Sequence, residues 1–102
     1  MTVRTINQRQ AVAAQAYARD WRAVNQSELG PMRRLEAQDS LRAARAVLTD
    51  QEVAILDLCA GRGRKIAEVA AAAGRPVQVM AELFLTASTK LADHYEARPG
   101  ES

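Results

Sequence analysis

The chain is poor in the residues that build disulfide frameworks, metal centres and aromatic cores. Its 102 residues include one cysteine, one histidine and only 4% aromatic residues. A single cysteine excludes an intramolecular disulfide and a cysteine-based metal site. With so few aromatic residues, the core must consist mainly of Ala, Leu, Val and Ile, which favours closely packed helices.

Long hydrophobic runs are also missing. No apolar segment approaches the roughly 20 residues that cross a bilayer. The first residues, MTVRTINQRQ, contain no hydrophobic stretch of the signal-peptide kind. We therefore expect a cytoplasmic protein without membrane contact. The length predicts one domain, over residues 1–97, followed by a disordered tail over residues 98–102.

Residues with catalytic potential are scattered. The only histidine, His94, has acidic neighbours in sequence, but the sequence contains no second cluster of catalytic side chains with which it could form a site. No Ser, Cys or Lys stands in a recognisable nucleophile motif, and the segment GRGR (61–64) lacks the Gly-Lys-Ser/Thr ending of a phosphate-binding loop. The sequence predicts no enzymatic activity, no metal site and no cofactor.

Helical periodicity recurs along the chain, whereas the alternation typical of strands is missing. Five helices are predicted, over about residues 5–24, 40–48, 49–61, 65–73 and 76–95. Between the first two, the polar segment NQSELGPMRR (25–34) is expected to form a loop because Gly30 and Pro31 break helices. The sequence thus predicts an all-α single domain of five helices with a helix-turn-helix-like core over residues 50–95 and a long C-terminal helix.

Several residues indicate how the later helices begin and end. Thr49 stands three residues before Glu52, the spacing of a capping box. Gly61 and Gly63 are expected to end the third helix, since glycine tolerates the left-handed conformation. The last helix carries a continuous apolar seam, which comprises Val77, Met80, Phe84, Ala87, Leu91 and Tyr95.

The strongest local pattern is that of a helix-turn-helix. This motif needs a small residue where its helices cross, a glycine in the turn and buried apolar residues in the second helix. Ala70, Gly74, Met80 and Leu83 occur in that order and at suitable spacing. Close packing of three helices by itself produces much of the same pattern, so a purely structural role of these residues stays open.

The segment LTDQEVAILDLCAGRGRKIAEVAAAAGRPVQVMAELFLTASTKL resembles the LuxR-type and sigma-region-four helix-turn-helix. The wider order of RQAVAAQAYARDWRAV, CAGRG and the closing Leu-Ala-Asp-His-Tyr (91–95) resembles a domain of unknown function in small phage-derived regulators, including activators of gene transfer agents. The resemblance implies a transcriptional regulator that contacts promoter DNA, RNA polymerase or both.

Basic residues cluster around this motif. Arg62, Arg64 and Lys65 precede it and Arg75 lies in its turn, where phosphate contacts are expected. The residues expected to point outward from the second helix are Val77, Gln78, Ala81, Glu82 and Leu85. Of these, only Gln78 suits hydrogen bonding to bases, so we expect DNA contact anchored on phosphates with weak base readout.

A second class of function stays open. Val79 and Leu85 lie off the seam of the last helix and predict an apolar surface for a protein partner or a homodimer. On this interpretation the chain is an interaction module, such as an RNA polymerase-binding adaptor or an inhibitor of a larger phage or host machine, without direct DNA contact. A small DNA-recognition subunit of a packaging machine is a third possibility.

Overall fold

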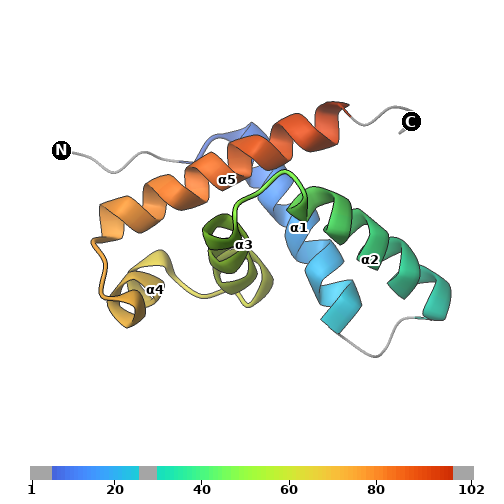
Figure 1. Cartoon of the computed structure of the whole chain (residues 1–102), viewed down its shortest axis with the longest axis horizontal. Coiled ribbons are helices and arrows are strands. Elements are labelled where there is room, and N and C mark those ends of the chain that lie inside the picture. Colours follow the sequence, from blue (N-terminus) through green and yellow to red (C-terminus); the bar gives the residue numbers. More distant parts are fainter. Residues whose placement is uncertain (1–5, 26–29, 98–102) are drawn as a thin grey trace.

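The longest helix, α5 (Val77–Ala97), is the element on which the rest of the chain packs. In the computed structural model, which describes residues 6–25 and 30–97, α5 runs along the top of Figure 1 and contacts the four other helices. Its buried residues are Met80, Ala81, Leu85, Ala87, Ser88, Leu91 and Ala92. The predicted seam is confirmed over most of its length, although Val77 is 44% exposed. The predicted tail, 98–102, lies outside the described residues.

The four shorter helices pack against α5. On one side, α1 (Gln8–Asn25) and α2 (Pro31–Arg45) pack as a helical hairpin, and on the other lie α3 (Asp50–Leu56) and α4 (Ile66–Ala73) (Figure 1). A turn of π-helix, η1 (Asp57–Gly61), continues α3. The described part of the chain contains no strand, which confirms the all-α single domain of five helices. None of these helices is long and apolar enough to span a membrane.

Two helices begin elsewhere than predicted. α1 starts at Gln8 because Asn7 caps it: the Gln10 amide N donates to Asn7 Oδ1 over 2.8 Å, and the Asn7 amide N donates to Gln10 Oε1 over 2.9 Å. α2 starts at Pro31, so the prediction of a loop through residue 34 is wrong. Proline suits the first position of a helix, since its φ is already helical and its missing N–H has no partner there.

The core consists of two apolar clusters, and α3 contributes to both. The first joins α1, α2, α3 and the C-terminal half of α5, with Tyr17, Leu41, Leu56 and Leu91 at its centre. The second joins α3, α4 and the N-terminal half of α5, and comprises Ile55, Val69, Ala70 and Met80. Phe84 of α5 packs against both clusters and so links the hairpin to the α3–α4–α5 unit.

Asp57, the first residue of η1, is held by two side chains of the hairpin. It accepts a hydrogen bond from the Tyr17 hydroxyl (2.7 Å) and forms an ion pair with Arg45 (Nη2–Oδ2 3.0 Å). Arg45 Nε also donates to the Tyr17 hydroxyl oxygen over 3.1 Å. Burial, opposed by Arg45 and reinforced by Asp57, raises the pKa of Tyr17, so the phenol stays protonated and donates. The three side chains join α1, α2 and η1 at one point.

Gly61 ends η1 directly against the indole of Trp21. The Arg62 amide N donates to Asp57 O over 2.9 Å, the five-residue step of a π-helix. A Cβ on Gly61 would lie 2.6 Å from Trp21 Cδ2. Gly61 is therefore needed for close packing, and its predicted left-handed conformation is wrong. Gly63, with φ of +73°, does adopt that conformation.

The Gly61–Trp21 contact predicts a steric cost. Gly61→Ala should lower the free energy of unfolding by about 1–3 kcal/mol, because extra atoms enter a filled contact. Gly30→Ala is the matched control: its φ is −64° and its added Cβ would meet nothing within 4 Å. The control should lose less than about 1 kcal/mol, a cost that arises because Gly30 is the N-cap of α2, where Ala is less favourable than Gly. Urea unfolding followed by circular dichroism measures both, and equal stability of the two variants would contradict the contact.

Thr49 and Glu52 form the predicted capping box at the start of α3. The Glu52 amide N donates to Thr49 Oγ1 (3.2 Å), and the Thr49 amide N donates to Glu52 Oε1 (2.8 Å). Lys90 Nζ of α5 donates to the same carboxylate oxygen over 2.9 Å. Burial opposes ionisation of Glu52, but the hydrogen bonds from Thr49 and Lys90 outweigh it and hold its pKa below the ordinary value.

This lowered pKa predicts a loss of stability in acid. Ionised Glu52 stabilises the fold at neutral pH, and its contribution is lost as the pH falls below the ordinary glutamate pKa of about 4.3 and then through the lower pKa of the folded state. Glu52→Gln should lower the free energy of unfolding at neutral pH by about 1–2 kcal/mol. The difference from the wild type should shrink at about pH 3. A difference of the same size at both pH values would refute this role of Glu52.

Candidate nucleic-acid interface

A short turn, Gly74, Arg75 and Pro76, joins α4 to α5. Gly74 is left-handed, with φ of +67° and ψ of 34°. The Gly74 amide N donates to Ala71 O over 3.2 Å, and the Arg75 amide N donates to Ala70 O over 3.0 Å. This pair of bonds is the Schellman pattern that ends a helix at glycine. The predicted turn at Gly74 is confirmed. α5 begins directly after Pro76, at Val77.

Small and apolar side chains hold α4 against α5. Ala70 is 1% exposed and lies in the cluster with Met80, beside the half-buried Leu83. The predicted packing of Ala70 against Met80 and Leu83 is therefore confirmed. Beyond this contact, every residue from 71 to 79 is exposed. We call residues 71–79 the elbow; it comprises the end of α4, the turn and the start of α5.

Four of the five residues predicted to contact DNA lie around the elbow. Arg64 and Lys65 precede α4, Arg75 lies in the turn and Gln78 belongs to the first turn of α5. All four residues are exposed. Within the described residues, none of their side chains forms a hydrogen bond or an ion pair. At 1.5 Å of rise per residue, the two ends of α4 are roughly 12 Å apart. That separation spans several phosphates of one nucleic-acid strand.

Arg62, the fifth predicted residue, packs against α1. Its guanidinium carbon lies 5.8 Å from the centre of the Trp21 ring, within the range of a cation–π interaction. Trp21 precedes Arg62 by 41 positions, so no local pattern could have indicated this contact. Three predicted cations, Arg64, Lys65 and Arg75, thus remain without a partner in the described part of the chain.

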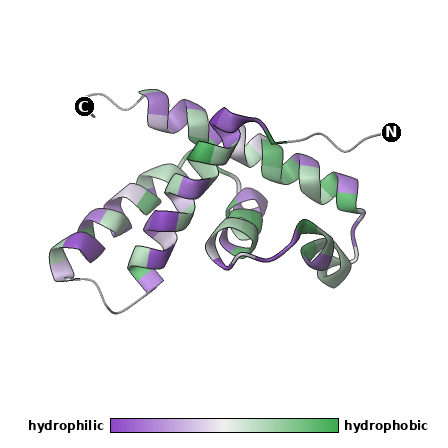
Figure 2. Ribbon diagram, turned by 180° about the vertical axis from the view of Figure 1, so that it is seen from behind, coloured by the Kyte–Doolittle hydropathy of each residue, from purple (hydrophilic) through white to green (hydrophobic). Residues whose placement is uncertain are grey.

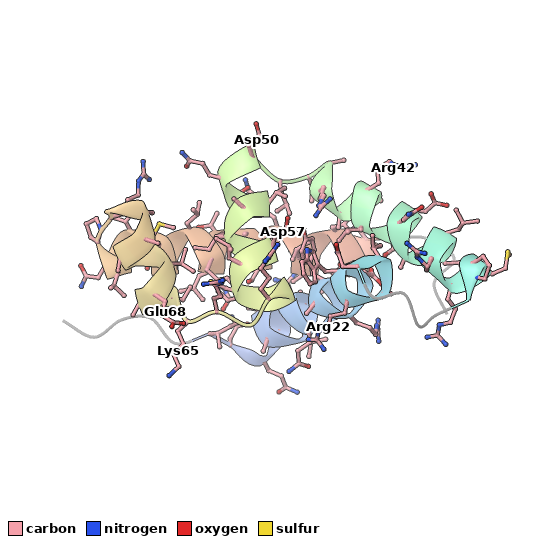
Figure 3. The ribbon with its side chains drawn as sticks, turned by 90° about the horizontal axis from the view of Figure 1, so that it is seen from below. Arg22, Arg42, Asp50, Asp57, Lys65 and Glu68 are labelled. Carbon is pink, nitrogen blue, oxygen red and sulfur yellow. The ribbon has the colours of Figure 1, made fainter. Side chains whose placement is uncertain are left out.

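Two arginines of α2, Arg42 and Arg45, do not extend this basic cluster. Figure 3 shows Arg42 at the edge of the molecule opposite Lys65, and Arg45 is paired with Asp57. Arg22 of α1 lies on the same edge as Lys65 in Figure 3. Arg22 follows Trp21, which contacts Gly61 and Arg62, and the local sequence does not indicate that α1 packs on η1 here.

The outward face of α5 is smaller than predicted. Ala81 and Leu85 are buried, at 9% and 5% exposure, so the prediction that they face outward is wrong. Gln10 of α1 lies next to this position, since its Nε2 donates to the Leu85 carbonyl oxygen over 3.3 Å. Leu85 therefore offers no surface to a partner or a second copy. Val79, the other residue predicted for such an interface, is 46% exposed in the elbow.

Acidic side chains reduce the positive charge around the elbow. Glu68 lies beside Lys65 in Figure 3, and its Oε1 accepts a hydrogen bond from the Lys65 amide N over 3.1 Å. Glu82 is exposed one turn after Gln78. Residues 62–82 hold four basic and two acidic side chains, a net charge of +2. The site is therefore moderately basic.

Comparisons with protein-family models, curated proteins and solved structures found no match to this chain. Its function must be inferred from the residues and their arrangement.

Proposed function

We propose that the chain is a small DNA-binding regulatory protein that holds DNA mainly by its phosphates. The observation that carries this proposal is a set of exposed cations, Arg64, Lys65 and Arg75, at the two ends of a short helix, whose side chains have no partner among residues 6–25 and 30–97. Cations in the turn and at the start of the first motif helix are suited to phosphate contact. The resemblance to phage-derived regulators favours a role in transcription.

The arrangement favours binding that depends strongly on salt. Each phosphate neutralised by an Arg or Lys releases counterions, so three contacts correspond to a log–log salt slope of roughly −3. The positive end of the α4 dipole adds to the attraction. Glu68 in the first turn of α4 offsets part of it, which is consistent with affinity in the range of non-specific binding.

Base selection on this account is weak. Gln78 is exposed at the start of α5 and has the amide that pairs with the N6 and N7 edge of adenine. Its neighbours Val77 and Val79 offer only apolar contact, such as with a thymine methyl group, and Glu82 repels phosphate. Specific promoter choice then requires a second copy or a protein partner.

The phosphate contacts predict the outcome of a charge-matched comparison. Binding of a fluorescent random-sequence duplex is measured by anisotropy at two salt concentrations. Changing Arg64, Lys65 and Arg75 together to Gln should weaken binding at low salt at least roughly tenfold and reduce the salt slope from about −3 toward zero.

The matched control removes the same charge from the helical hairpin. Arg19, Arg33 and Arg34 are exposed and have no side-chain partner among the described residues, and all three are changed to Gln. This variant should keep most of the affinity, with a salt slope close to that of the wild type. Equal losses in the two triple variants, or unchanged binding by the first, would refute the proposed site.

A further inference from the structure

A groove on the α3–α4–α5 unit has an apolar lining that the proposed DNA contact does not use, although its rim shares Arg64 and Arg75 with that contact. It encloses about 480 Å³, with α3 and α4 as walls and α5 as floor. The apolar side chains that line it include Ala54, Leu58, Val69, Ala72, Met80 and Leu83. In Figure 2, α4 and the first half of α5 are mostly hydrophobic, whereas the link before α4 is hydrophilic.

The groove stays open because α4 is short and rich in alanine. Ala72 and Ala73 are exposed and line its wall, and their side chains are single methyl groups that fill little space. α4 packs on α5 and η1 instead of lying along α3. Leu58 and Leu83 are consequently only half-buried, although both pack against the second core cluster. A side chain from outside could complete the burial of both.

Charge at the rim indicates what kind of segment would fit. Arg64 borders the groove at the beginning of α4 and Arg75 borders it at the end. Both are exposed and lack a side-chain partner in the described ranges. The one acidic residue of the lining, Glu68, already accepts a hydrogen bond from the Lys65 amide N. The rim therefore attracts carboxylates at two points separated by the length of α4.

We propose that this groove binds an amphipathic helix of a partner protein that has apolar residues on one face and acidic residues near both ends. A helix is about 10–12 Å wide and needs two to three turns to reach from one end of α4 to the other. Apolar residues at helical spacing would contact Leu58 and Leu83, and the acidic residues would pair with Arg64 and Arg75. This interface replaces the predicted one at Leu85 and does not depend on DNA binding.

A constrained helical peptide tests the groove directly. The probe is a fluorescein-labelled peptide of about four turns with Leu on one face and Glu at both ends, and its comparison peptide has Lys in place of Glu. Anisotropy titration should give micromolar binding of the acidic peptide and binding of the basic peptide that is at least roughly tenfold weaker. Absence of acidic-peptide binding at millimolar concentration, or equal binding of both peptides, would overturn the proposal.

Two single variants of α4 locate the binding surface. Ala72→Glu puts a charge into the groove, whereas Ala71→Glu puts the same charge on an exposed position outside its lining. Ala72→Glu should weaken binding of the acidic peptide at least roughly tenfold, and Ala71→Glu less than about threefold. Equal losses would place the peptide elsewhere and overturn the proposal.

Light scattering of the wild type and both variants tests whether a second copy of the chain occupies the groove instead. A dimer of the wild type that Ala72→Glu dissociates and Ala71→Glu preserves would assign the groove to a second copy and overturn the partner assignment. A monomer in all three samples supports it. Since no DNA is present, failure of the groove and failure of the phosphate site can be told apart.

Discussion

The hydrogen-bonded cluster of Tyr17, Arg45 and Asp57 connects the two halves of the molecule. Asp57 lies where α3 continues into the π-helical turn. Its carboxylate accepts hydrogen bonds from the Tyr17 hydroxyl and the Arg45 guanidinium of the hairpin. A half-buried carboxylate is stable in such a place only because both partners are present. Together with the apolar cluster around Leu56 and Leu91, these three side chains hold the α3–α4–α5 unit on α1 and α2.

The position of the candidate site follows from this connection. The extra residue of the π-turn brings Gly61 onto Trp21, and the same indole then holds the Arg62 guanidinium. Arg64 and Lys65 follow this contact in the chain and directly precede α4. Their side chains have no partner in the described residues. Within the described residues, the contact with Trp21 thus separates Arg62 from Arg64 and Lys65 in the GRGRK segment.

Local sequence signals predicted the α3–α4–α5 unit better than the hairpin. The Thr49–Glu52 box, Gly74 and the seam of α5 depend on neighbours within one or two turns, and the structure has them as expected. The start of α2 at Pro31 differs from the predicted loop, because a proline that ends a helix and a proline in the first turn of a helix cannot be told apart from the sequence. The burial of Leu85 and the stacking of Arg62 could not be predicted, since both depend on α1, which is distant in sequence.

On the proposed function, DNA contacts the elbow and the cations beside it. This contact is tested most directly by following the backbone amide resonances of the whole chain while a random-sequence duplex is added at low salt. The account predicts that the largest chemical-shift changes occur at Arg64, Lys65, Arg75 and Gln78, and that added salt reverses them. Changes confined to the arginines of the α1–α2 hairpin, or no changes at all, would contradict it.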